Sequence, residues 1–172
     1  MHTENGLLLD PTLPGLPLGG WPAIGAGVEG NAVFAQAGGS ATKGYVGIVG
    51  VAPRTFIRIA AVVPSASSVQ QFALIRQVTG AALLTSAFAP LFRVSDVVQA
   101  HCIGGADQTV LGPGTPHILV GFPPAFTGTF NLAGSDFLGL PLVLFPGDAL
   151  VVLSGTVNVT ATLTVNICEM AT

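Results

Sequence analysis

Residues 157–168 alternate apolar and polar side chains without a break, and this run constrains the fold more than any other feature. The odd-numbered positions are all apolar: Val157, Val159, Ala161, Leu163, Val165 and Ile167. Successive side chains of a β-strand point to opposite faces, whereas a helix repeats every 3.6 residues. The run therefore predicts a long strand with one face in a hydrophobic core.

The opposite face of this strand is polar but carries no charge. Its central members are Thr160, Thr162 and Thr164, flanked by Asn158 and Asn166. Thr and Asn suit a cross-strand ladder or a hydrated interface better than open solvent. We therefore expect Thr160, Thr162 and Thr164 to form an interface between subunits.

Most of the remaining chain consists of short runs rich in β-branched and aromatic residues, separated by Gly and Pro. This pattern predicts further strands at residues 45–51, 55–63, 81–86, 91–103, 109–111, 117–122, 126–132, 140–145 and 149–153. Within 55–63 we place Phe56, Arg58 and Ala60 on one face. Residues 69–78 also fit helical spacing, so a helix stays the alternative to the strand that we favour.

A chain of many short strands without alternating helices is typical of a sandwich or barrel. Closure or a double sheet also protects the exposed edges that an uncharged sheet otherwise offers to other chains. We predict an all-β fold, a single antiparallel jelly-roll-like barrel or sandwich over residues 41–172. The sequence Pro146-Gly147-Asp148 predicts a turn near its end, with Asp148 accepting backbone N–H bonds within that turn.

Residues 1–40 differ from this body because they are rich in Gly and Pro yet apolar. Proline fixes φ and removes a backbone donor, so neither a helix nor a central strand is expected there. We predict an extended N-terminal arm that docks on the body or on a neighbouring subunit. Its anchors are Leu13, Leu16, Leu18 and Trp21. For the first ten residues a mobile terminus is the alternative.

The charge content limits the kinds of partner. Half of the 172 residues are hydrophobic but only 8% are charged, against roughly 25% in an ordinary soluble domain. Such a chain exposes apolar surface unless it is covered by assembly. The net charge of −3 and the scattered cations argue against direct binding of nucleic acid, which needs clustered cations.

A membrane span is also not expected. No run of about 20 apolar residues occurs, because Pro64 interrupts one candidate and Pro141 the other. Residues 1–10 contain acidic residues where a signal peptide has a basic start.

No catalytic, cofactor-binding or metal-binding site is predicted. His101, Asp107 and His117 lie near one another in the sequence, but their spacing matches no metal-ligand signature. The Gly-rich stretch around Lys43 lacks the arrangement that cradles phosphate. Two cysteines, Cys102 and Cys168, are too few for a disulfide framework, and we expect two buried thiols rather than one bridge.

The end of the chain resembles the closing hairpin of small virion proteins of bacteriophages. There, as in residues 142–165 here, an apolar strand, a Pro-Gly-Asp turn, a short strand and a long Val/Thr strand follow one another. The resemblance implies a non-enzymatic capsid subunit or capsid-decoration (cement) protein of the virion. It also implies that the chain packs against itself, as a trimer or larger, and against other capsid proteins.

Two other functions remain open. One is a receptor- or glycan-binding head domain of a phage tail fibre or spike, although the chain has one Trp and one Tyr to offer to a ligand. The other is a metal-dependent β-barrel enzyme that uses His101 and His117, for which further ligands are not apparent.

Overall fold

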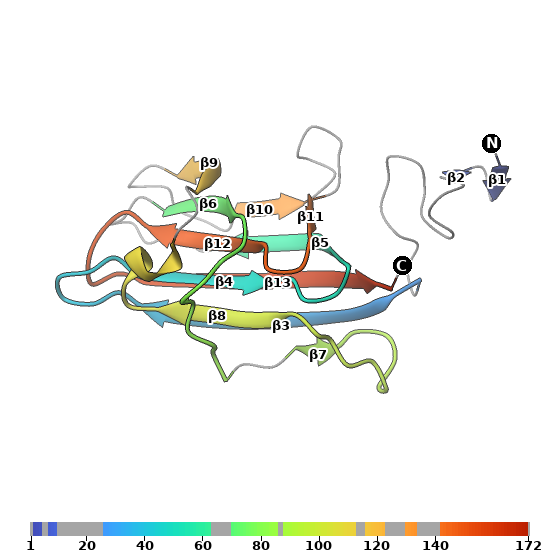
Figure 1. Ribbon diagram of the computed structural model, residues 1–172, viewed down its shortest axis with the longest axis horizontal. Coiled ribbons are helices and arrows are strands. Elements are labelled where there is room, and N and C mark those ends of the chain that lie inside the picture. The colour runs from blue at the N-terminus through green and yellow to red at the C-terminus, as the bar shows by residue number, and fades with distance from the viewer. Residues whose placement is uncertain are drawn as a thin grey trace.

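Two antiparallel β-sheets, stacked on each other, form the body of the protein (Figure 1). The computed structural model describes residues 2–4, 7–9, 26–62, 70–85, 88–112, 116–122, 130–133 and 142–171. The prediction of an all-β fold is confirmed, since within these residues the only helix is the four-residue 3-10 turn η1 (Gln108–Leu111). No helix in the described part of the chain is long and apolar enough to cross a bilayer.

The first sheet has six strands, of which two share one edge of β5. Its order is β7 (Ala89–Pro90), β3 (Val28–Ala37), β13 (Thr160–Met170), β5 (Arg54–Val62), and then β10 (Phe130–Ala133) and β11 (Leu142–Leu144), which both pair with β5. The long strand β13 lies in the middle of this sheet.

The second sheet has five strands. Their order is β8 (His101–Gly105), β4 (Tyr45–Val49), β12 (Ala149–Ser154), β6 (Gln70–Ile75) and β9 (His117–Phe122). A separate pair, β1 (His2–Glu4) and β2 (Leu7–Leu9), lies near the N-terminus.

Strand pairing is nested along the chain. β3 pairs with β13, β4 with β12, β5 with β10 and β11, and β6 with β9. Along these strands the chain passes back and forth between the two sheets at almost every connection. The segment between β6 and β9 adds β7 to the edge of one sheet and β8 to the edge of the other.

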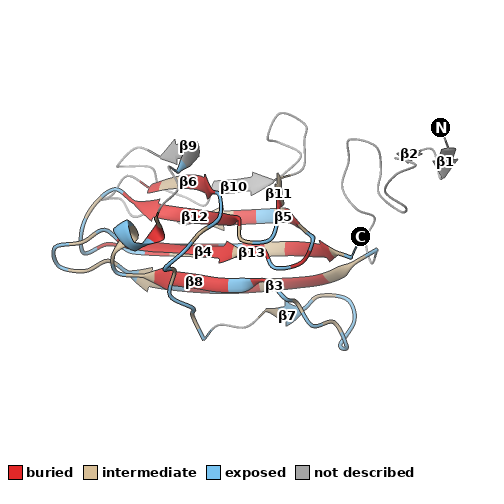
Figure 2. Ribbon diagram, viewed as in Figure 1, coloured by how far each residue is buried: buried red, intermediate tan, exposed pale blue. Residues whose placement is uncertain are grey.

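The main core fills the space between the sheets, where Figure 2 shows buried residues along the central strands. Phe34 and Leu163 from the first sheet pack in the same cluster as Ile48, Phe72 and Leu150 from the second. Burial of each such side chain contributes about 1.5–3 kcal/mol to folding. The strand β6 supplies Phe72 to this core, so within 69–78 the residues Gln70–Ile75 form a strand and not a helix.

A second cluster covers the outer face of the five-stranded sheet. Tyr45, Ala73 and Val151 point away from the main core and pack with Ile103 and with Leu111 from η1. The strands β6 and β12 are therefore buried on both faces, which explains the continuous apolar runs at residues 72–75 and 149–153.

The long closing strand has the predicted faces but starts later than predicted. Val159, Leu163 and Val165 are buried, whereas Thr160 and Thr164 are exposed. Asn158 adopts a positive φ of 57°, so a turn ends just before β13 and leaves Val157 outside the ladder. The predicted assignment of faces is confirmed from Val159 to Ile167.

The predicted faces of the strand at 55–63 are correct up to Arg58 and wrong beyond it, because β5 contains a bulge. Ile57 pairs with Ile167 and Ile59 with Asn166, so Arg58 is an extra residue in the ladder. An extra residue inverts the alternation beyond it. Ile57 and Ala60 therefore both lie in the core, and Arg58 lies on the opposite face from Ala60.

Three other predictions of strands are wrong in whole or in part. Of the predicted strand at 81–86, residues 81–85 are described, and they contribute only an isolated bridge between Leu83 and Ile103. Residues 91–100 are irregular up to the start of β8. Residues 109–111 belong to η1, whose start is capped by the carboxylate of Asp107, a bond that competes with extended structure.

The predicted boundary between the N-terminal arm and the body, at residue 40, also lies too far along the chain. β3, at residues 28–37, pairs with β13 over its full length, so these residues belong to the sandwich and not to an arm. Gly30 and Asn31 hide this strand in the sequence, because both are poor strand formers.

The Pro146-Gly147-Asp148 turn forms as predicted, with Gly147 at a φ of 86° and the Asp148 N–H donating to the Phe145 carbonyl at 2.9 Å. The predicted role of the Asp148 side chain is wrong. Its buried carboxylate forms an ion pair with Arg76 and accepts a bond from the Gln77 N–H at 3.4 Å. It therefore joins this turn to the end of β6.

Candidate interaction surfaces

The three threonines predicted to form an interface lie together on the outer face of the six-stranded sheet. Thr160 and Thr164 are exposed and Thr162 is partly exposed. They are aligned along β13 because alternate residues of a strand share a face.

The neighbouring strands extend this face with small and apolar side chains. Opposite Thr160, Thr162 and Thr164, β3 places Ala37, Ala35 and Val33. On the other side, β5 places Ala61 opposite Thr164 and Ile59 opposite Asn166. We call the surface formed by these residues the threonine face: Ala35, Ala37, Val33, Ile59, Ala61, Thr160, Thr162, Thr164 and Asn166.

The threonine face contains no charged residue, although Val33 is 70% and Ile59 39% exposed. The nearest charges on the same side of the sheet are Glu29 and Arg58, whose ion pair at 3.1 Å lies towards the end of β13. Water solvates exposed Val, Ile and Ala side chains poorly. A charge-free patch of these residues and Thr is therefore suited to contact with another protein.

The two sheets differ in how their outer faces are covered. Part of the chain between β6 and β9, including Val78, Ala81 and Leu111, packs over the five-stranded sheet. Within the described residues no such cluster covers the threonine face, and a smaller cluster of Phe56, Cys168, Val143 and Met170 lies at one end of that sheet.

The four predicted anchors of the arm, Leu13, Leu16, Leu18 and Trp21, lie outside the described residues.

The candidate metal ligands are not brought together. His101 begins β8 and His117 begins β9, at opposite edges of the five-stranded sheet. Asp107 caps η1 by accepting bonds from the Thr109 N–H and hydroxyl at 3.0 and 2.8 Å, which lower the pKa of its carboxyl group. No group of three His, Cys, Asp or Glu residues in the described part of the chain is arranged to hold a metal ion.

The glycine-rich stretch around Lys43 has a structural use in the fold. The Thr42 hydroxyl donates to the Ala106 carbonyl at 2.6 Å, and the Lys43 carbonyl accepts from the Gln108 N–H at 2.8 Å. These bonds attach the stretch to the segment that leads into η1.

Both cysteines are free and buried, which confirms the prediction of two separate thiols. Cys102 lies in the core between the sheets and Cys168 in the cluster on the outer side of the six-stranded sheet. Burial raises the pKa of the Cys102 thiol to about 11. It also raises the pKa of Cys168, and the nearby charge of Arg58 opposes this shift.

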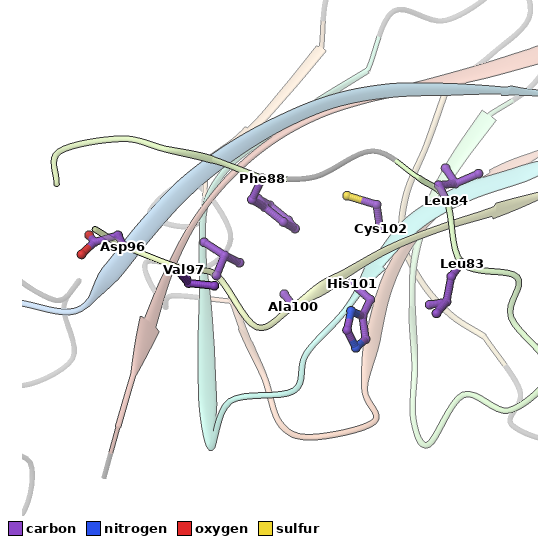
Figure 3. A pocket seen from close by; sticks show the side chains of 9 residues that line it. Leu83, Leu84, Phe88, Asp96, Val97, Ala100, His101 and Cys102 are labelled. Carbon is purple, nitrogen blue, oxygen red and sulfur yellow. The ribbon is translucent and has the colours of Figure 1, made fainter. Parts of the chain in front are cut away.

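A recess of about 360 Å³ lies at the edge where β7 and β8 bring the two sheets together. Apolar side chains and polar groups both line it: Phe88, Leu84 and Cys102 are buried or partly buried there, and the exposed Leu83, Val97 and His101 are also among the lining residues (Figure 3). The sequence did not reveal it because residues 81–86 and 91–103 resemble strands. The signal that the sequence does contain is the apolar stretch from Phe88 to Val98, which has no regular period.

No protein-family model, curated protein or solved structure matches this chain.

Proposed function

We propose that this protein is a non-enzymatic structural subunit of a bacteriophage particle, a capsid or capsid-decoration protein that acts by packing against copies of itself and against other capsid proteins. The observation that carries the proposal is the threonine face, an exposed sheet surface without charge. In a molecule whose other sheet is covered by its own chain, such a face is the natural contact surface for a neighbour.

We further propose that the sandwich is a jelly roll. In that fold a long antiparallel hairpin is rolled up into two sheets, and its outer strands pair with each other, as do its inner strands. The nested pairs of β3 with β13, β4 with β12, β5 with β10 and β11, and β6 with β9 support this topology. Jelly rolls occur in viral capsid proteins and also in lectins and cupins, so the fold is compatible with the proposed function without requiring it.

The proposal requires association of the purified protein, as a trimer or a larger species. Light scattering at several protein concentrations measures this. A protein that stays monomeric at high concentration contradicts the proposal.

Electron microscopy of native particles tests the location in the virion. Density that fits the sandwich in the shell supports a capsid or decoration role, and density only at the tip of a fibre supports the receptor-binding alternative.

Deleting residues 1–20 tests the predicted N-terminal arm. We expect this deletion to weaken assembly and to leave the melting temperature of the sandwich unchanged. Unchanged assembly contradicts a docking role for Leu13, Leu16 and Leu18, which this deletion removes.

A further inference from the structure

The outer edge of β3 is covered over only part of its length. β7 pairs with Gly30 and Asn31, near the start of β3, and no other strand in the described part of the chain pairs with this edge. Figure 1 accordingly shows the short β7 beside one part of the long β3. Residues 32–37 therefore form an open edge, with β13 as their strand neighbour on the inner side.

Alternate residues along this edge point their backbone groups outwards. The Glu29 carbonyl points to the side of β7, because it accepts from the Leu91 N–H at 3.0 Å. In an antiparallel ladder the N–H and C=O of one residue point to the same neighbouring strand, and successive residues alternate between the two neighbours. Val33, Ala35 and Ala37 therefore direct their N–H and C=O groups away from β13.

These outward groups are left without strand partners among the described residues. The Gln36 side-chain amide donates to the Ala37 carbonyl at 3.2 Å. Val33, Ala35 and Ala37 are all exposed, and Val33 is 70% exposed. Proteins protect such edges with charges, proline or bulges, and residues 32–37 contain none of these. The edge is therefore a template for a further strand.

The corresponding edge of the five-stranded sheet is protected by the chain itself. The Leu84 N–H donates to the Cys102 carbonyl at 2.9 Å. The Gly104 N–H donates to the Ala82 carbonyl at 3.0 Å. Residues 82–84 thus cover β8, whereas the open part of β3 has no such cover in the described residues.

We propose that the open edge of β3 pairs with the same edge of a second copy, antiparallel and centred on Ala35. Ala35 then lies opposite Ala35 of the second copy, and Val33 lies opposite its Ala37. In this register every outward residue meets an outward residue, and a two-fold axis perpendicular to the sheet generates it. The Ala37 carbonyl can accept the new bond beside that from Gln36, because a carbonyl oxygen has two lone pairs.

Two properties of the edge favour a copy of itself as the partner. The hydrogen-bonding groups at 33, 35 and 37 are symmetric about Ala35, so two identical edges match without leaving any of them unpaired. The side chains that meet are Ala or Val, so no like charges oppose each other. The proline-rich residues 11–22 are a poorer partner, because each proline lacks the N–H that a paired strand donates.

The pairing joins the threonine faces of both copies into one wider surface on the same side of the sheet. The inference deepens the proposed function and rests on it, since it names one contact through which copies associate.

Cysteine pairing in the full chain tests the register. The two Cα atoms of residue 35 should lie about 5.5 Å apart, within the roughly 4.4–6.8 Å that a disulfide spans. Those of residue 37, and those of residue 33, should lie roughly 15 Å apart. Under mild oxidation Ala35→Cys should therefore give a disulfide-linked dimer, and Ala37→Cys alone or Val33→Cys alone should give several-fold less.

An equimolar mixture of Val33→Cys and Ala37→Cys should again give the linked dimer, because residue 33 of one copy faces residue 37 of the other. The unaltered protein is the control, since its own Cys102 and Cys168 are buried.

Charge exchange at Ala35 gives a second measurement. Ala35→Lys and Ala35→Glu each place like charges opposite each other, so each should weaken self-association in sedimentation equilibrium about fivefold or more. Their equimolar mixture places opposite charges together and should associate more strongly than either variant. Val110→Lys, at an exposed valine of η1, is the matched control and should associate like the unaltered protein.

Three results overturn the inference. One is disulfide formation by Ala37→Cys alone as readily as by Ala35→Cys, and another is a charge mixture that associates no better than its components. The third is a cysteine at position 35 that a thiol reagent reaches only after deletion of residues 1–20, which assigns the edge to the N-terminal segment.

Failure of the inference and failure of the proposed function are distinguishable. Association without disulfide formation at position 35 overturns the inference alone. Disulfide formation at position 35 in a protein that is absent from native particles overturns the proposed function alone.

Discussion

At the scale of single residues, neighbours on β13 occupy opposite environments. Leu163 is fully buried between the sheets and touches the core that both sheets share. Thr164, the next residue, is exposed on the threonine face. Their positions follow from the two-residue period of the strand, so substitutions at the two sites should differ sharply in cost.

Leu163→Ala should lower the free energy of unfolding by about 2–5 kcal/mol, because it removes buried methyl groups and leaves a cavity. Thr164→Ala should cost no more than about 1 kcal/mol, the span of strand propensities. Urea denaturation of both variants measures the difference. A larger loss for the threonine variant contradicts the assignment of faces.

The buried thiol of Cys102 should make stability depend on pH at the alkaline end. Its pKa of about 11 in the folded protein exceeds the value of about 8.5 expected in an unfolded chain. The unfolded state therefore loses its proton first, and the stabilisation is fully present below the unfolded pKa and is lost as the pH rises through the folded pKa.

We expect the free energy of unfolding to fall between about pH 8.5 and pH 11, by up to about 1.4 kcal/mol for each unit between the two pKa values. Cys102→Ala should flatten this decline, and denaturation at several pH values checks it. An identical decline in the variant assigns the effect to other groups.

The bulge at Arg58 could not be predicted from the sequence. Its run, residues 55–63, reads as an unbroken strand, and nothing local marks the bulge. The bulge is set by the tertiary ladder, because β5 must match β13 on one side while Arg58 reaches Glu29 on β3. In β13 the period has no such interruption, and its faces could be predicted.

At the scale of elements, the turn before β12 combines backbone geometry with a long-range ion pair. Gly147 needs its positive φ of 86°. The next residue, Asp148, joins the turn to Arg76 at the end of β6. The turn therefore fixes the start of β12, the central strand of its sheet.

Gly147→Ala should destabilise the fold by about 1–2 kcal/mol, because L-residues avoid left-handed backbone conformations. Gly112→Ala is the matched control, since an added Cβ there meets no other atom within 4 Å and φ is negative. Thermal melts of the two variants provide the comparison. Equal melting temperatures contradict the importance of this turn.

Element identity was predictable where periodicity or composition is strong, as in β6, β9, β12 and β13. It was not predictable for η1, where a single Asp107 cap overrides the β-branched residues Thr109 and Val110. It also failed for β3, whose weak strand formers gain their structure from pairing with β13 on one side. The threonines of the candidate interface were found because they lie on the strand with the clearest pattern.

At the scale of the whole molecule, the two sheets have different roles. The five-stranded sheet is covered on one face by the main core and on the other by the cluster around Leu111. The six-stranded sheet exposes the threonine face. The proposed assembly uses this difference, so a charge introduced on the threonine face should affect association more than folding.

Thr164→Arg should leave the melting temperature nearly unchanged, because surface substitutions cost about 0.5 kcal/mol or less. It should weaken assembly strongly, since a charge without a partner is then buried in the contact. Light scattering compared with that of Thr164→Ala separates the effect of the charge from the loss of the threonine. Full assembly of the arginine variant excludes this face as a contact.

The nested pairing of strands also has a consequence for the order of events on the ribosome. β3 is synthesised early, but its long ladder forms with β13, the last strand of the sandwich. Contacts so distant in sequence are slow to form, and β3 and β5 wait for the strand that lies between them. During synthesis the chain therefore carries unpaired apolar strands, and these are open to aggregation until β13 emerges.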